Sequence, residues 1–494
     1  MAVIDVSAAT APVFEFDNTY ARDLDGLYAR QDPVPVDAPR LVRFNRELAL
    51  DLGIDAERID GEMTAVFAGN VVPPGAEPIA QAYAGHQFGS FNPQLGDGRA
   101  ILLGEIVTPS GARRDLALKG SGRTPFSRGG DGRAALGPVL REYLMGEAMD
   151  ALGIPTTRAL AAVTTGEPVY RDGALPGAVL TRVASSHLRV GTFEFFGARG
   201  RTDDVERLVR YSLERHDPDL VDDPNPALAL LRSVSERQAS LIAAWMNVGF
   251  IHGVMNTDNT AISGETIDYG PCAFLEVYDP ATFFSSIDQG GRYAFGNQPT
   301  IARWNIARLA EALVPSIADD PARAVEMATE VIDAFPDRFE HHWLEGLRRK
   351  LGLTSVAAED RSLAIDWLEL LQAQRVDFTL GWRWLDDEER LRSLFADQAV
   401  LDAWLARWRD RSDRDGSDAR RRAALRASAN PIVIPRNHLV EAALTAAVIN
   451  DDFDVFDRLL AAVRRPFDER PEPGDLVEPA PLAFTSSYRT FCGT

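Results

Sequence analysis

The sequence predicts an α+β chain, with strands concentrated in its first part and helices filling most of the rest. Apolar runs and alternating patterns typical of strands occur between residues 100 and 183. From about residue 195 onward, apolar side chains recur with helical spacing. At 494 residues, the chain is long enough for about two or three packed domains. We therefore expect a strand-rich part followed by a larger helical part.

The composition argues against several classes of partner. The 52 Lys and Arg residues face 73 Asp and Glu residues, and the net charge of −21 disfavours a nucleic-acid partner. The longest uncharged run, 238–257, is too polar to span a membrane, and the N-terminus has no signal-peptide pattern. Two cysteines, Cys272 and Cys492, cannot form a disulfide framework. We expect a soluble, cytoplasmic protein with no membrane partner.

Residues 1–95 mix short helical patterns with Pro-rich connections, and pieces such as 41–44 are expected to pack on something larger. The segment 81–89 is rich in glycine and aromatic residues. Its His86 could be a ligand, but a lone histidine of this kind is more often packed and hydrogen-bonded. We assign it no chemistry.

A glycine turn opens the first long strand. Gly96, Gly98 and Arg99 directly precede the apolar run 100–107. Backbone N–H groups of such a turn can approach phosphate, and an arginine can close over it. The turn is a candidate nucleotide site.

A second strand, 115–119, ends in Lys119, the only lysine among residues 1–349. An arginine-rich chain that keeps one amine at a strand end suggests that a compact point charge is needed there. The alternative is a strand-end lysine that simply reaches water.

Two glycine clusters follow this lysine, and the second contains Asp131 and Gly132. Flexible loops also use glycine, but clusters that flank a lysine strand favour nucleotide contact. A helix is predicted over 134–152. Its Glu142 is either a solvated charge or a partner that holds Lys119 in place.

Strand patterns continue at 159–164, 169–170 and 178–183, and two arginines follow closely. Arg182 ends the last strand and Arg189 lies seven positions later. Their planar guanidinium groups could clamp phosphate oxygens. Structural ion pairs are the competing interpretation.

The rest of the chain is predicted to be mainly helical. A central helix is expected over 227–248, and a basic run at 420–426 is interpreted as a solvated helix face. Further helices are expected at 304–313, 321–334, 339–351, 363–375, 399–409 and 439–448. Pro and Glu accumulate after residue 465, which predicts an extended tail.

The segment 250–271 concentrates hard oxygen ligands. It contains Asp258, Asn259 and Asp268, and a Ser-Gly-Glu turn between them predicts a hairpin that brings Asn259 beside Asp268. An amide and a carboxylate side by side suit Mg²⁺ or Mn²⁺ carrying a nucleotide. The alternative is an Asx-rich surface loop.

The order of these features matches the parts of a protein-kinase core. HGVMNTDN at 252–259 resembles a kinase catalytic loop, and Asp268-Tyr269-Gly270 resembles the metal-binding triplet of kinases. The kinase base, however, falls at Val254 in this register, and the usual glycine-rich loop signature is missing. A conventional kinase mechanism is therefore not expected.

Taken together, the motifs resemble the selenoprotein O, or YdiU, family of kinase-fold protein nucleotidyltransferases. The resemblance covers nearly the whole chain and is most specific in YAGHQFG, QLGDGRA, LKGSGRTPFSRGGDGRA, LREYL, LTRVASSHLRVGTFE and HGVMNTDN with DYGP. It implies a kinase-like bilobal fold with a small β-rich N-lobe and a helical C-lobe. The implied division is an extension at 1–95, an N-lobe at 96–184, a C-lobe at 185–350 and a helical region with a tail at 351–494.

The resemblance also implies roles for individual residues. Asp258 would be the general base, Asn259 and Asp268 would bind Mg²⁺ or Mn²⁺, and Glu142 would pair with Lys119. The nucleotide would be contacted by Gly96, Gly98, Arg99, Lys119, Asp131, Gly132, Arg182 and Arg189. The implied reaction moves AMP from ATP, or UMP from UTP, to Ser, Thr or Tyr hydroxyls of protein substrates.

Three points stay open. Cys492 lies where family members with selenocysteine carry it, and we hypothesise a redox-labile bridge to Cys272; two unrelated cysteines are the alternative. The chain could instead be an inactive ATP-binding pseudokinase scaffold, although its intact base and metal pair argue against this. It could also be a kinase that transfers the γ-phosphoryl group.

Overall fold

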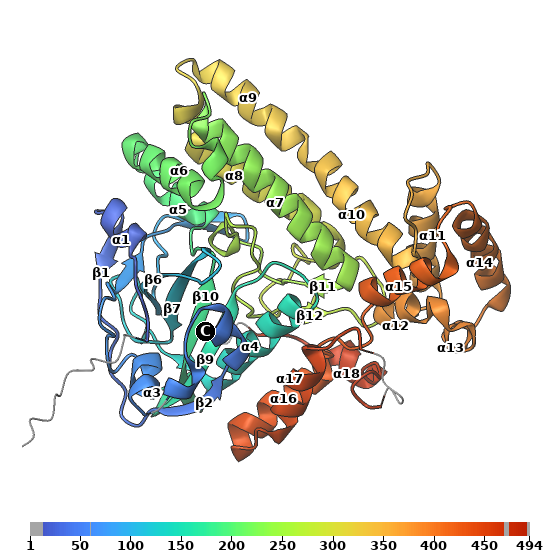
Figure 1. Cartoon of the computed structure of the whole chain (residues 1–494), viewed down its shortest axis with the longest axis horizontal. Helices are drawn as coiled ribbons and strands as arrows, with labels where there is room; N and C mark the ends of the chain where they lie inside the picture. Colours follow the sequence, from blue (N-terminus) through green and yellow to red (C-terminus); the bar gives the residue numbers. More distant parts are fainter. Residues whose placement is uncertain (1–12, 60, 469–473, 492–494) are drawn as a thin grey trace, which may run out of the picture. The chain divides into compact units, whose positions relative to one another are not determined.

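The computed structural model describes residues 13–59, 61–468 and 474–491, which fall into two compact units (Figure 1). Unit 1 comprises Met1–Ala82, Gly96–Ala134 and Ala159–Ser186. Unit 2 comprises Tyr83–Leu95, Ala135–Arg158 and His187–Thr494. A strand-rich unit from the first part of the chain and a helical C-terminal half confirm the α+β prediction. The four-part division stays a prediction.

Unit 1 is built on one sheet. Its strands lie in the order β1 (Tyr28–Arg30), β3 (Ile79–Gln81), β6 (Ala100–Val107), β7 (Arg113–Lys119), β10 (Ala174–Ala184), β9 (Arg158–Tyr170) and β2 (Arg40–Phe44). The strands predicted from residue 100 onward are confirmed. Residues before 83 contribute three short strands: β2 pairs with β9, β3 pairs with β6, and β1 pairs with β3.

Unit 1 also contains short helices. They are α1 (Thr19–Asp23), α2 (Arg46–Asp51), η1 (Ala56–Arg58) and α3 (Gly61–Ala68). Asn45 caps α2 by accepting a hydrogen bond from the Leu48 N–H at 3.2 Å. Leu48 and Phe67 then pack in one buried cluster with Leu116 and Leu160 of the sheet. This core fixes β7 and β9, and with them the position of the Lys119 backbone.

Unit 2 is mainly helical, with two short strand pairs: β4 (Gly85–Gln87) with β5 (Ser90–Asn92), and β11 (Phe250–Ile251) with β12 (Ala273–Phe274). The two-residue strand β8 (Ala134–Ala135) lies where the chain passes from unit 1 to unit 2. The helices up to residue 351 are α4 (Leu136–Ala151), α5 (Val190–Gly197), α6 (Thr202–His216), η2 (Pro218–Leu220), α7 (Pro226–Val248), η3 (Thr257–Asn259), η4 (Phe295–Asn297), α8 (Gln298–Ile317), α9 (Pro321–Asp333) and α10 (Phe335–Leu351). Figure 1 shows α9 and α10 following one another end to end, with α7 and α8 running alongside them.

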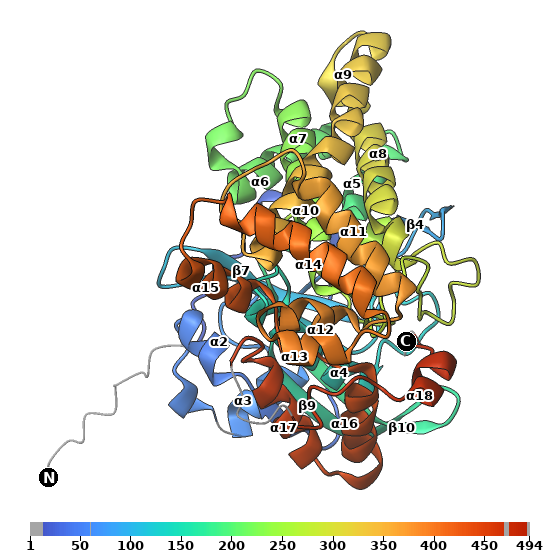
Figure 2. The same cartoon turned by 90° about the vertical axis from the view of Figure 1, so that its right-hand side faces the viewer.

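The helices predicted at 363–375, 399–409 and 439–448 are confirmed. The C-terminal region contains these helices and others between and after them. They are α11 (Asp360–Ala373), α12 (Phe378–Arg383), η5 (Trp384–Asp386), α13 (Glu388–Ser393), α14 (Gln398–Asp413), α15 (Ala419–Ala429), α16 (Asn437–Asn450), α17 (Asp454–Val463) and α18 (Leu482–Ser487) (Figure 2). Across the described chain, no helix combines the length and apolar character needed to cross a bilayer. The described end, 474–491, is not a trailing tail: it includes α18, and Val477, Ala480 and Tyr488 are buried.

Helix α7 delivers the chain to the predicted catalytic segment. Asn225 caps its start, and Gly249 ends it in the left-handed conformation with φ of +77°. The chain then enters β11, and Phe250 and Ile251 pair with Phe274 and Ala273 of β12. This pairing closes residues 252–272 into a loop that contains Asp258, Asn259 and Asp268.

Candidate active site

Glycines in the turns of unit 1 lie very close to other parts of the chain. Gly96 has φ of +69°, and a Cβ there would lie 2.3 Å from Cγ of Phe126. Gly132 also has φ of +69°, and a Cβ there would lie 2.1 Å from the Gly122 carbonyl oxygen. Side chains are therefore excluded at both positions. At Gly98, the carbonyl accepts a hydrogen bond from the Ser127 hydroxyl, which ties the first turn to the following loop.

Several arginines of these turns are available to bind an anion. Among the described residues, Arg99, Arg123 and Arg128 have no ion-pair or hydrogen-bond partner for their side chains. Asp131 differs, because Arg171 binds its carboxylate at 2.8 and 3.2 Å and lowers its pKa. Free guanidinium groups beside tight glycine turns suit phosphate.

Lys119 and Arg182 occupy the same face of the sheet. In the antiparallel pairing of β7 with β10, Lys119 lies opposite Leu180 and Ala117 lies opposite Arg182. Alternate residues of a strand share a face, so the two cations are diagonal neighbours at about 7–8 Å. Arg182 is buried and Lys119 is half-buried. Two cations at this spacing can both contact one polyphosphate.

The loop of unit 2 corrects the predicted hairpin. The turn is present, because the Gly264 N–H donates to the Ala261 carbonyl at 3.1 Å. Its two arms do not pair with each other, however: Ala261 pairs with Arg189 and Thr266 pairs with Thr156. Tertiary partners for both arms are available in the fold, and they replace the local ladder that the sequence pattern indicated.

His252 holds the two ends of this loop together. It is buried and stacked on Trp245, and its Nε2 donates to the Ile267 carbonyl at 2.8 Å. Burial lowers its pKa, so it stays neutral and structural. Asp268, which follows Ile267 in the chain, has φ of +63°. This conformation is strained, and Asp tolerates it better than most residues.

Asp258 and Asn259 lie on the single turn η3. Oδ2 of Asp258 accepts a hydrogen bond from Nε2 of Gln87 at 3.3 Å, and its Oδ1 is shielded from solvent without a hydrogen-bond partner among the described residues. Burial raises the pKa of Asp258 to about 6, against the lowering effect of Arg189. A carboxylate with such a pKa suits proton transfer near neutral pH.

Arg189 and Glu142 both lie in unit 2. The Arg189 guanidinium stacks on the Tyr83 ring, with Cζ 4.3 Å from its centroid. Glu142 is buried on α4, and its charge contributes to the raised pKa of Tyr269 and Cys272. Lys119 belongs to unit 1, so its predicted pairing with Glu142 stays a prediction.

Sequence reasoning missed three residues around Asp258 and Arg189, namely Tyr83, Gln87 and Glu194. Tyr83 and Gln87 lie in the Gly- and aromatic-rich segment 81–89, and neither was predicted to have a role. His86 is packed and hydrogen-bonded as predicted, and it bonds to Glu194. The signal for Glu194 was a single acid in the apolar run of α5, while Tyr83 and Gln87 had no specific sequence signal.

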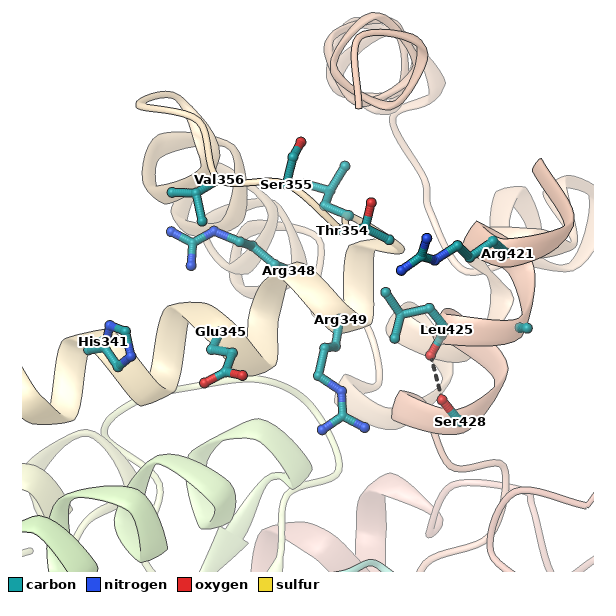
Figure 3. A pocket seen from close by; sticks show the side chains of 12 residues that line it. His341, Glu345, Arg348, Arg349, Thr354, Ser355, Val356, Arg421, Leu425 and Ser428 are labelled. Atoms are coloured by element: carbon teal, nitrogen blue, oxygen red, sulfur yellow. Dashed lines mark hydrogen bonds between the residues drawn. The ribbon is translucent and has the colours of Figure 1, made fainter. Parts of the chain in front are cut away.

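A separate pocket of about 720 Å³ lies between α10 and α15 (Figure 3). Its wall includes His341, Glu345, Arg349 and Arg421. None of the residues predicted to act in nucleotide transfer lines it. Arg420 and Arg421 of α15 are exposed, in keeping with the interpretation of a solvated helix face. Arg426, at the end of the same basic run, is buried and bonds Asp386 at 2.7 Å, so the interpretation is wrong for this residue.

Cys272 is buried, and burial raises its pKa to about 12. Cys492 lies outside the described residues, so the proposed pair stays a prediction. The described chain comes close to Cys272, however: the Thr490 hydroxyl donates to the Pro271 carbonyl at 2.7 Å.

Comparison with known proteins identifies the family over nearly the whole chain. Residues 13–464 match the family described as "Protein adenylyltransferase SelO". The protein nucleotidyltransferase YdiU of Cereibacter sphaeroides is 58% identical over 486 residues, which cover 97% of this chain and 100% of that protein. The YdiU proteins of Rhizobium etli and Methylorubrum populi are each 56% identical, over 97% and 98% of this chain and 97% and 99% of their own lengths.

The class of protein is therefore a protein nucleotidyltransferase. The chain belongs to the SelO family of protein adenylyltransferases.

Proposed function

We propose that the chain transfers AMP from ATP to Ser, Thr and Tyr hydroxyls of other proteins, within a bilobal fold of the protein-kinase type. UTP, with transfer of UMP, is a second donor. The observation that carries the proposal is the loop closed by β11 and β12. It holds the base candidate Asp258 and the ligand candidates Asn259 and Asp268 within one short segment.

The donor set of this loop fits a hard divalent cation such as Mg²⁺ or Mn²⁺. Asn259 donates its Nδ2 hydrogen to the Val254 carbonyl at 3.1 Å, which orients its Oδ1 away from that bond. With the carboxylate of Asp268, this provides two oxygen ligands and no nitrogen or sulfur. When bound, the ion neutralises charge on the phosphates.

The cations of the site would orient the triphosphate. Lys119 and Arg182 share one sheet face, and Arg99 has no competing partner among the described residues. In unit 2, Arg189, stacked on Tyr83, would supply a further positive charge. These residues would turn the nucleotide so that its α-phosphorus, rather than its γ-phosphorus, meets the acceptor hydroxyl.

Asp258 would act as the general base. As the acceptor oxygen attacks the α-phosphorus, its proton passes to the Asp258 carboxylate, the bond to the bridging oxygen breaks, and pyrophosphate leaves. Alignment and charge neutralisation supply most of the rate enhancement, and the base supplies about 10²-fold or more.

Labelled ATP separates this proposal from its alternatives. The protein is incubated with ATP labelled at either the α- or the γ-phosphate, with Mg²⁺ or Mn²⁺ and a protein acceptor. Transfer of the α label supports nucleotidyl transfer. Transfer of the γ label would indicate a kinase, and no transfer with retained ATP binding would indicate a pseudokinase scaffold.

The first prediction concerns Asp258→Ala in this assay. We expect α-label transfer to fall by about 10²-fold or more, because the proton acceptor is lost, while ATP binding is largely kept. Single-turnover transfer and equilibrium ATP binding measure the two effects. Undiminished labelling by the variant would remove Asp258 as the base.

A further inference from the structure

The hairpin formed by β4 and β5 lies directly against the turn that carries Asp258. The His86 N–H donates to the Thr257 hydroxyl at 2.7 Å, and the Phe88 N–H donates to Oδ1 of Asn256 at 3.2 Å. Both acceptors come immediately before Asp258 in the chain. The hairpin backbone therefore holds the side chains of the two residues that precede Asp258.

A buried hydrogen-bond chain fixes this contact. Nδ1 of His86 bonds to Oε1 of Glu194 at 2.5 Å, and Oε2 of Glu194 accepts from the Thr257 hydroxyl at 2.5 Å. Thr257 thus donates to Glu194 and accepts from the His86 backbone, which uses its hydroxyl in both directions. The His86 ring is enclosed by Phe91 and Trp304, with centroids 4.9 and 5.2 Å away. Each member of the chain has a fixed orientation.

The same hairpin touches the carboxylate itself. Nε2 of Gln87 donates to Oδ2 of Asp258 at 3.3 Å. At Gly85, an added Cβ would lie 2.5 Å from Oδ1 of Asp258, so only glycine lets the strand approach this closely. The position of the hairpin and the orientation of the Asp258 carboxylate are consequently linked.

We propose that His86, Gln87 and Glu194 are positioning residues for the transfer step. Gln87 orients the Asp258 carboxylate, and the chain from His86 through Glu194 to Thr257 keeps the hairpin and the turn η3 in register. The inference rests on Asp258 being the base in the proposed function. None of the three residues contacts the nucleotide in this proposal, so they act on the rate and not on nucleotide binding.

The test compares two substitutions of His86. His86→Leu removes the bond to Glu194, and we expect kcat for α-label transfer to fall about 10- to 100-fold with an unchanged KM for ATP. His86→Asn keeps a donor near the position of Nδ1 and should restore most of the rate. His342→Leu is the matched control, because its Nε2 also bonds a glutamate, Glu236, at 2.6 Å, but on the distant helix α10.

A double-substitution cycle separates positioning from loss of folding. In an Asp258→Asn background, His86→Leu should cause little further loss, because the group that it positions no longer accepts a proton. Wild-type kcat in His86→Leu, or a loss that is fully additive with Asp258→Asn, would overturn the inference. Gln87→Leu and Thr257→Val provide a second test in case His86→Leu does not fold. If neither of these two variants lowers kcat, the inference fails.

The outcome also distinguishes the inference from the proposed function. If Asp258→Ala retains transfer, the base assignment itself is wrong. If Asp258→Ala loses transfer but His86→Leu and Gln87→Leu do not, only the positioning role is wrong.

Discussion

Lys350 is the only lysine of the chain besides Lys119, and it is fully buried on α10. Its Nζ lies 5.0 Å from the centroid of Trp382 and 5.7 Å from that of Phe378. Desolvation lowers its pKa to about 7, since the aromatic faces replace only part of the lost hydration. Its charge therefore opposes folding at neutral pH.

We predict that Lys350 makes stability rise with pH between about 7 and 10. The unfolded chain keeps a lysine pKa near 10.4 and binds more protons in this range, so the free energy of unfolding increases by up to about 1.4 kcal/mol per pH unit. Below pH 7 both states are protonated and the slope vanishes. Urea unfolding of the wild type and Lys350→Met at several pH values should show a flatter dependence for the variant; equal slopes would contradict the assignment.

Gly132 and Gly129 offer a second test at the residue scale. Both have positive φ, but a Cβ at Gly129 meets nothing within 4 Å, whereas one at Gly132 meets the backbone of Gly122 at 2.1 Å. Gly129→Ala should cost about 1–2 kcal/mol from backbone strain alone. Gly132→Ala should cost more and should also weaken ATP binding, because the two glycine loops must separate. Thermal unfolding and ATP titration check both variants, and equal effects would argue against the packing explanation.

At the scale of elements, one buried arginine joins three segments of unit 2. Arg436, at the start of α16, bonds Glu276 at 2.6 Å and Asp377 at 2.6 and 3.0 Å. It also donates to the Val477 carbonyl at 3.1 Å, which draws in the C-terminal segment. An extended tail was predicted from the Pro- and Glu-rich composition of that segment. The prediction was wrong because the local sequence does not reveal the distant partner Arg436.

Removing this arginine should strongly destabilise the protein. We predict that Arg436→Met lowers the free energy of unfolding by about 3–5 kcal/mol, because two buried carboxylates lose their counter-charge. The control is Arg458→Met, whose partner Asp475 is 59% exposed, and a cost of at most about 1 kcal/mol is expected there. Denaturant unfolding measures both; similar costs would show that burial of the Arg436 network is unimportant.

Strands and helices could be predicted where the spacing of apolar residues in their own sequence determines them. The strands β6 and β7 and the helices α7 and α10 follow from apolar spacing and from Pro or Gly at their ends. The arms of the turn at Gly264 could not be predicted, because their partners, Arg189 and Thr156, lie far away in sequence. Asp258 could be proposed as the base from its motif. Gln87, which donates a hydrogen bond to it, could not be predicted, because it lies 171 residues away in sequence.

At the scale of the whole molecule, the end of the chain returns to its middle. The Thr490 hydroxyl donates to the Pro271 carbonyl, and Thr490 also forms a β-bridge with Ser285.

We predict that hydrogen peroxide, which accepts two electrons from two thiols, joins Cys272 to Cys492 in a disulfide. Mass mapping of the non-reduced protein should find the linked peptides, with Cys272→Ser as the control. Two free thiols after oxidation would contradict the pairing.

The way in which the two units share the chain has a consequence for biosynthesis. Helix α4 belongs to unit 2 and packs on α16 and α17, which begin about 290 residues after it ends. At about 5–20 residues per second, the ribosome needs roughly 15–60 s to supply these partners. During that interval the apolar face of α4 has nothing from α16 or α17 to cover it, so the nascent protein should depend on chaperones. A fragment of residues 187–494 lacks α4, so the sides of α16 and α17 that contact α4 would be uncovered. Such a fragment should aggregate when it is expressed alone.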